Sequence, residues 1–219
     1  MAKKEITDVA KKEVTESAAL KVAKWLTEKA MGGAGPVSSA DALAMEYLIN
    51  VDYVDHDERV DSLIFWETTK NFTSGFITGL GGVITLPVSI PAALSASWLL
   101  QARMIGAIAK IYGHSLDDDR VKTMILLTIT GNDIKEILKE AGVKIGTKVT
   151  YKIIEAIPGK ILIEINKKVG FRLLTKAGEK GIVNLTKLVP GVGGLIGGSV
   201  DAVSCRTVGK LAKHAFKQK

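Results

Sequence analysis

The residues best suited to chemistry form an acidic cluster in the first third of the chain. Five carboxylates and one histidine lie close together: Asp52, Asp55, His56, Asp57, Glu58 and Asp61. A histidine among carboxylates can ligate a divalent metal, and at the mouth of a lipid-sized pocket such groups would titrate abnormally, as in an enzyme. A helical metal site uses a second histidine three or four residues away, but His114 and His214 are far off in the sequence. We therefore interpret the cluster as a solvated acidic face, with a metal or catalytic site as the alternative.

The single cysteine does not complete a catalytic pair. As a nucleophile, Cys205 would need a histidine base nearby, and His214 lies nearly three turns further along the same expected helix. We interpret Cys205 as a buried structural residue. A lone cysteine also excludes an internal disulfide and fits a reducing compartment.

The familiar nucleotide-binding and hydrolase motifs are missing. In the two glycine-rich segments, GLGGVI and GVGGLI, Ile84 and Ile196 stand where a GxGxxG loop needs its last glycine. There is no P-loop, GxSxG, HExxH or CxxC motif. The sequence thus predicts no catalytic residue, no cofactor and no metal, and an enzyme is the less favoured interpretation.

One uncharged segment organises the rest of the chain. No charged side chain occurs between Lys70 and Arg103, so this stretch must be buried in protein or in lipid. Glycines and prolines interrupt it, at Gly79, Gly81, Gly82, Pro87 and Pro91. A single transmembrane helix needs about 20 apolar residues without a break. The pattern predicts instead a helical hairpin, either in a protein core or entering lipid, whose second helix runs from Pro91 to a stop at Gly113.

Helical patterns with recognisable starts surround this segment. Residues 4–30 have the spacing of an amphipathic helix, and a glycine-rich connector follows, from Met31 to Ser39. Ser38 with Asp41 predicts a capping box for the next helix. Ser115 with Asp118 predicts another, so that the three aspartates 117–119 offset the dipole of a helix that ends near residue 131.

The segment from residue 148 to 165 has two interpretations. KVTYKI and ILIEI flank Pro158 and Gly159 and have the propensity of a β-hairpin. The charged side chains of Lys148, Lys152 and Glu155 lie on one helical face. We therefore predict two helices broken at Pro158, preceded by a short helix capped by Asn132. The expected fold is all-α: a single helical domain built around the hydrophobic hairpin, with residues 1–37 as an N-terminal helix and connector and residues 38–219 as the main helical domain.

A second glycine-rich segment, Leu188 to Val200, precedes a basic tail. Gly193 and Gly197 have the spacing that allows close helix packing, and we expect them to face the helix that begins at Pro91. In the tail, apolar residues share one side and basic residues surround them: Val208, Leu211, Ala215 and Phe216, with Arg206, Lys210, Lys213 and Lys217. A basic amphipathic helix of this kind can lie on an anionic membrane.

The charge is unevenly distributed. The formal net charge is +7, yet acids outnumber bases eight to two from Asp41 to Lys70, and bases outnumber acids twelve to six from Asp133 to Lys187. Basic surfaces attract anionic lipid headgroups or nucleic acid. Aromatic residues are only 5% of the chain, so the pattern of an RNA-binding surface is missing and lipid is favoured. The N-terminus has no apolar signal region.

Three short patterns resemble a known family. They are Gly-Gly-x-x-Thr-x-Pro at Gly81 to Pro87, Ala-x-x-Tyr-Gly at Ala109 to Gly113, and Pro-x-x-Gly-x-x-x-Gly at Pro190 to Gly197. With them, the chain from roughly residue 50 to 217 resembles the EcsC family of bacterial proteins. The resemblance implies a helical, membrane-associated protein of a family named after a gene beside an ABC transporter. It supplies no agreed reaction and no catalytic residues.

Together these patterns predict a non-enzymatic EcsC-type protein that is cytoplasmic and peripheral to the bacterial inner membrane. The expected partners are anionic lipid and an integral membrane protein such as an ABC transporter, and not nucleic acid. The alternative is a pore-forming or membrane-disrupting effector whose hairpin inserts into the bilayer. The residues expected to contact membrane or partner are Phe76, Gly79, Gly81, Gly82, Pro87, Pro91, Trp98, Gly193, Gly197, Lys210, Lys213 and Phe216.

Overall fold

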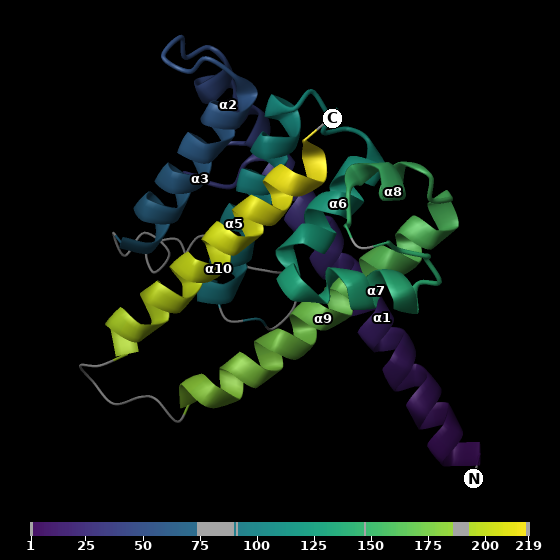
Figure 1. Ribbon diagram of the computed structural model, residues 1–219. Coiled ribbons are helices and arrows are strands. Elements are labelled where there is room, and N and C mark those ends of the chain that lie inside the picture. The colour runs from purple at the N-terminus through teal and green to yellow at the C-terminus, as the bar shows by residue number, and fades with distance from the viewer. Residues whose placement is uncertain (1, 74–89, 91, 147, 186–192, 218–219) are drawn as a thin grey trace.

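The computed structural model confirms the all-α prediction (Figure 1). It describes residues 2–73, 90, 92–146, 148–185 and 193–217, and the side chains of 16–69, 90, 94–146, 148–177 and 203–217. Within these ranges there is no strand, only an isolated bridge between Ala34 and Val37. The helices are α1 (Ala2–Gly32), α2 (Ala40–Leu48), α3 (His56–Thr73), α5 (Ala92–Ile111), α6 (Asp119–Ile129), the 3-10 turn η1 (Gly131–Asp133), α7 (Ile134–Glu140), α8 (Tyr151–Glu155), α9 (Gly159–Leu185) and α10 (Gly193–Phe216).

Helix α5 is the centre of the fold. It packs against α1, α2, α3, α6 and α10 (Figure 1). From Leu94 to Ile111 every residue is buried except Arg103 and Lys110, which are half-buried. A helix that is apolar on all sides needs such an environment. The second arm of the predicted hairpin therefore lies in a protein core, while its first arm falls on residues 74–89, outside the described residues.

A buried ion pair joins the two ends of the uncharged segment. Arg103 Nη1 donates to Glu67 Oε2 at 3.0 Å, and the two side chains are only 11% and 6% exposed. This pair holds α3 beside α5. Arg103 Nη2 also donates to Ser38 Oγ at 2.8 Å. The prediction that Ser38 caps α2 is therefore wrong: Ser39 is the N-cap, and its hydroxyl accepts from the Ala42 N–H at 3.0 Å.

The N-terminal helix is part of the same core. Val22, Leu26 and Ala30 are fully buried, and α1 packs against α9 and α5. The predicted connector forms a tight turn in which Ala34 and Val37 exchange two backbone hydrogen bonds. Buried side chains on both sides of residues 37 and 38 belong to one hydrophobic cluster.

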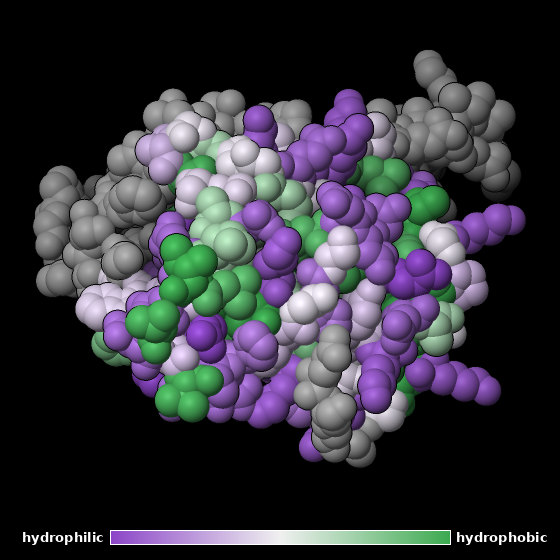
Figure 2. All heavy atoms as spheres, turned by 90° about the horizontal axis from the view of Figure 1, so that it is seen from above, coloured by the Kyte–Doolittle hydropathy of each residue, from purple (hydrophilic) through white to green (hydrophobic). Residues whose placement is uncertain are grey.

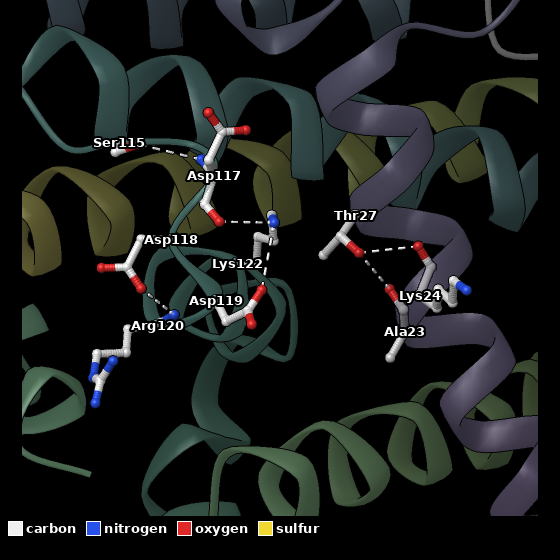
Figure 3. A network of polar contacts seen from close by, with 9 residues as sticks. All are labelled: Ala23, Lys24, Thr27, Ser115, Asp117, Asp118, Asp119, Arg120 and Lys122. Carbon is white, nitrogen blue, oxygen red and sulfur yellow. Dashed lines mark hydrogen bonds and ion pairs between the residues drawn. The ribbon is translucent and has the colours of Figure 1, made fainter. Parts of the chain in front are cut away.

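The aspartates before α6 have the predicted structural role, with one correction (Figure 3). Asp118, not Ser115, is the N-cap, because its carboxylate accepts from the Arg120 N–H at 2.8 Å. Ser115 Oγ instead accepts from the Asp117 N–H at 3.4 Å. Asn132 does not cap α7 either: Asp133 holds that position and makes no side-chain capping bond.

The ambiguous segment is helical, so the two-helix prediction is confirmed and the β-hairpin is wrong. Helix α8 ends at Glu155 and α9 begins at Gly159, directly after Pro158, where a proline suits the start of a helix. The break places α9 across α1 and α6. Buried Ile154, Leu162 and Ile165 join this layer to the core.

Candidate functional site

The acidic cluster and the basic tail, which lie at opposite ends of the sequence, meet in the fold. Helix α10 packs along α3 and α5 (Figure 1). Lys213 Nζ is 2.7 Å from Asp61 Oδ1 and also donates to the Asp57 carbonyl oxygen at 3.4 Å. Lys217 Nζ pairs with the Asp57 carboxylate. Since low residue numbers on α3 pair with high numbers on α10, the two helices are antiparallel.

Asp57 is the most strongly bound of these acids. It accepts hydrogen bonds from Lys217 and, at 2.7 Å, from the Tyr112 hydroxyl. The hydrogen bond from Lys217, followed by that from Tyr112, lowers the pKa of Asp57 below its ordinary value. Burial, together with the bond to Asp57, raises the pKa of Tyr112. Asp57 is therefore a structural anion that ties α10 to both α3 and the end of α5.

The last turn of α10 is anchored by aromatic side chains. Phe216 packs edge-on against His114, with ring centroids 5.2 Å apart, and lies 5.9 Å from the ring of Tyr151. A ring nitrogen of His114 is 2.9 Å from the Phe216 carbonyl oxygen. The Tyr151 hydroxyl donates to Asp118 at 3.0 Å, and burial with this bond raises the pKa of Tyr151 to about 12. The end of the tail is thus part of the core.

Two more acids of the cluster, Asp55 and Glu58, accept backbone hydrogen bonds at the start of α3. Asp55 accepts from the Glu58 N–H at 2.8 Å, and Glu58 accepts from the Val54 N–H at 2.9 Å. Among the described residues no group of three or more histidine, cysteine, aspartate or glutamate side chains could hold a metal ion. Asp52 and Asp55 are exposed, as a solvated acidic face requires, whereas the Asp57 carboxylate is paired with Lys217 of the protein's own tail.

The structure describes only part of the set of predicted contact residues. Phe76, Gly79, Gly81, Gly82, Pro87 and Pro91 lie outside the described residues, and for Gly193 and Gly197 only the helical backbone of α10 is described. Trp98 and Phe216 are 7% and 1% exposed, so here they contact protein. Lys213 is held by Asp61. Of the twelve, Lys210 is described as an exposed side chain.

Sequence reasoning missed an exposed apolar loop. In the turn between α2 and α3, the side chains of Ile49, Val51 and Val54 are 71%, 91% and 88% exposed. Figure 2 looks down on the end of the molecule where this loop lies and shows a group of hydrophobic side chains there. The available signal was the mixture of aliphatic and polar residues from 49 to 55, Ile-Asn-Val-Asp-Tyr-Val-Asp, which matches no amphipathic helix.

Two exposed aromatic side chains lie near this loop on α3. Phe65 and Trp66 are both partly exposed and pack edge-on with ring centroids 5.3 Å apart. Trp66 also lines a shallow groove of about 380 Å³ between α2 and α3, together with Glu46, Tyr47, Asn50 and Tyr53. Met45 on α2 is exposed as well. This side of the molecule therefore exposes several aliphatic and aromatic side chains close together. Such a group of exposed apolar residues is typical of an interaction site, whereas isolated exposed apolar residues are common on any protein surface.

No helix in the described part of the chain is both long and apolar enough to span a bilayer. No curated protein and no solved structure matches the chain. The model of the EcsC protein family matches residues 2–219, and so takes in the N-terminal helix that precedes the region on which the resemblance rested. Since this match covers the chain almost from end to end, the protein belongs to the EcsC family.

Proposed function

We propose that this protein is a non-catalytic component of the inner face of a bacterial membrane, which it contacts through the loop between α2 and α3. The observation that carries the proposal is the exposure of Ile49, Val51 and Val54. Three aliphatic side chains in one short loop, beside exposed Phe65 and Trp66, favour a surface that is covered by lipid or by a partner. Aromatic rings of this kind suit the interface between lipid and water.

The charged side chains of the loop and of α10 refine the expected contact. Asp52 and Asp55 alternate with the aliphatic residues and are exposed, so they oppose a strongly anionic surface at this point. Lys213 and Lys217, two lysines of the tail, are already paired with acids of α3. Arg206 and Lys210 are exposed on α10. We therefore assign membrane insertion to the loop and the preference for anionic lipid to these two residues.

Flotation with liposomes tests the proposal. The wild type should float with both zwitterionic and anionic vesicles, and more strongly with anionic ones at low salt. The double variant Val51→Asp, Val54→Asp should lose most of the flotation with both. A matched control is Phe171→Asp, an exposed hydrophobic residue on α9 outside the loop, which should float as the wild type does.

Arg206 and Lys210 provide a second test in the same flotation experiment. Arg206→Ser with Lys210→Ser should remove the extra binding to anionic vesicles and leave binding to zwitterionic vesicles unchanged. A loop variant that floats as well as the wild type would disprove the role of the loop. Recovery of the wild type only in the soluble fraction, under every lipid condition, would disprove membrane contact altogether.

A membrane protein could take the place of lipid at the same loop. Cytoplasmic segments of integral membrane proteins are enriched in lysine and arginine, and the acids that alternate with Ile49, Val51 and Val54 complement such a segment. Binding to native membranes but not to protein-free vesicles, lost in the loop variant, would identify this second partner.

A further inference from the structure

Three helix faces enclose a second candidate site, away from the α2–α3 loop. Helices α1, α6 and α9 surround a cavity of about 400 Å³, a volume within the range of small-molecule sites. Each helix contributes four residues with the spacing of one helical face: Leu20, Ala23, Lys24 and Thr27 from α1, Asp119, Lys122, Thr123 and Leu126 from α6, and Gly159, Leu162, Ile163 and Asn166 from α9.

Two residues that line this cavity each have a buried polar atom without a hydrogen-bond partner. The two atoms are Thr123 Oγ1 and Asn166 Oδ1. Thr123 is completely buried, and its hydroxyl does not bond to the α6 backbone as the hydroxyl of Thr128 does, at 2.7 Å from the Met124 carbonyl oxygen. An unpaired buried polar atom costs free energy. A ligand that can donate to Asn166 and bond with Thr123 would recover it, and a hydroxyl group does both.

Two lysines in the cavity wall provide positive charge. Lys122 Nζ donates to the Asp117 carbonyl oxygen at 2.9 Å and to Asp119 at 3.4 Å, which leaves one of its three N–H groups. Figure 3 shows these bonds of Lys122 on α6, and the Thr27 hydroxyl on α1 bonded to the Ala23 and Lys24 carbonyl oxygens of its own helix. Lys24 forms only an exposed pair with Glu28, at 3.6 Å, which is weak in water. Asp119 is the single acid in the wall, so the lysines favour an anionic group.

The rest of the wall is aliphatic. Leu20, Leu126, Leu162 and Ile163 line the cavity together with Ala23. An apolar wall beside a few convergent polar groups is typical of sites for small amphipathic molecules. We propose that this cavity binds a hydroxyl-bearing phosphate ester: the hydroxyl group bonds to Thr123 and Asn166, the phosphate lies by Lys24 and Lys122, and the carbon skeleton packs on the aliphatic wall. This site does not depend on the membrane contact proposed above.

This chemistry has two sources, a free polyol phosphate or a lipid headgroup. Calorimetric titration of the full chain with three probes separates them: inorganic phosphate, glycerol 3-phosphate, and a short-chain monoacyl glycerol 3-phosphate below its micelle concentration. The site predicts saturable binding of at least one ester, tighter than that of inorganic phosphate. Equal binding of the two esters identifies a free polyol phosphate, and binding of the acylated ester alone identifies a lipid.

Thr123→Val tests the polar part of the site. It should weaken ester binding about tenfold, as expected for one lost hydrogen bond, while the melting temperature without ligand stays the same or rises, because an unpaired buried hydroxyl is removed. The matched control is Thr128→Val, whose hydroxyl is bonded within α6, and which should bind the ester normally. Lys24→Gln should weaken binding severalfold and reduce its dependence on salt.

Three results would overturn the proposal. The first is that neither ester binds at millimolar concentration. The second is that inorganic phosphate binds as tightly as the esters, which indicates charge alone. The third is that Thr123→Val binds as the wild type does, or lowers the melting temperature as much as Thr128→Val, which indicates a purely structural residue.

Discussion

Two helix crossings in this fold are held together in different ways. Helix α9 crosses α1 at Gly170, where an added Cβ would lie 2.0 Å from the Ala19 carbonyl oxygen. Helix α10 crosses α3 at Gly209, where an added Cβ would lie 2.9 Å from Ile64 Cγ1. The first contact meets backbone, which cannot move unless α1 moves. The second meets a side chain, which can.

The two crossings also differ in charge. Between the described side chains of α1 and α9 there is an exposed pair of Lys167 and Glu16, at 3.3 Å. Between α3 and α10, Lys213 and Lys217 both bind acids of α3. The α1–α9 crossing is therefore fixed mainly by shape, whereas a larger part of the α3–α10 contact is electrostatic. The exposed apolar loop directly precedes α3, and so lies next to the α3–α10 crossing, which is the more adaptable of the two crossings.

Gly170→Ala should have the largest effect on stability. In an open helical position alanine is more favourable than glycine by about 1 kcal/mol, but here the clash with the Ala19 backbone should destabilise the fold by about 3 kcal/mol. Gly159→Ala, at the start of the same helix with nothing within 4 Å, is the control and should not destabilise. Urea unfolding of both variants measures the difference, and a Gly170→Ala variant as stable as the control would show that α9 does not cross α1 so closely.

Gly209→Ala should destabilise the fold less than Gly170→Ala does. Ile64 can change its side-chain position to admit the new methyl group, and the helical preference of alanine offsets part of the strain. We expect a loss of about 1 kcal/mol, measured in the same unfolding experiment. A loss larger than that of Gly170→Ala would reverse the comparison between the two crossings.

The smallest effect should come from the charges of the α3–α10 contact. Asp57→Asn with Asp61→Asn should lower the melting temperature slightly at low salt and not at high salt, because exposed pairs are screened. Asp52→Asn, in the same acidic segment but in the loop before α3, should change nothing. A melting temperature that falls equally at low and high salt would mean that these carboxylates act through packing.

The pH dependence of this contact follows from Asp57. The pKa of Asp57 is lower in the folded protein than the ordinary value of 3.8. Its contribution to the free energy of unfolding is therefore complete above pH 3.8, and it is lost as the pH falls through the pKa of the folded state. The pKa of Lys217 is raised above 10.5 by the bond to Asp57, so the pair persists between these limits. Hydrogen exchange of the last turns of α10 should increase in acid, and the increase should be absent in Asp57→Asn.

Much of the fold was predictable because it depends on local pattern. The uncharged stretch after residue 91 is buried all round as α5, and the break at Pro158 separates α8 from α9. The caps were predicted within one to three residues, since Ser38 and Ser39 are equally suited to capping until the long-range bond from Arg103 occupies Ser38. Pattern alone cannot supply such a partner.

The candidate sites were less predictable because they depend on which segments meet. The basic tail has the pattern of a membrane-binding helix, but its apolar side, including Phe216, packs in the core, and Lys213 and Lys217 pair with acids on α3. The apolar loop was missed in the sequence because its aliphatic residues stand among the aspartates of the acidic cluster. The cavity between α1, α6 and α9 has no sequence signature, since Thr123 is an ordinary helical residue until its hydroxyl is found without a partner.

The most direct test of the membrane proposal places a fluorophore on the loop. In a Cys205→Ala background, an environment-sensitive dye attached to a cysteine at position 51 reports the polarity around the loop, and the same dye at position 171 on α9 is the control, since both native side chains are exposed. We predict that vesicles shift the emission at position 51 to the blue, with quenching by lipids labelled near the headgroup, and leave position 171 unchanged. Equal emission with and without vesicles at position 51, while the protein is bound, would contradict insertion of the loop.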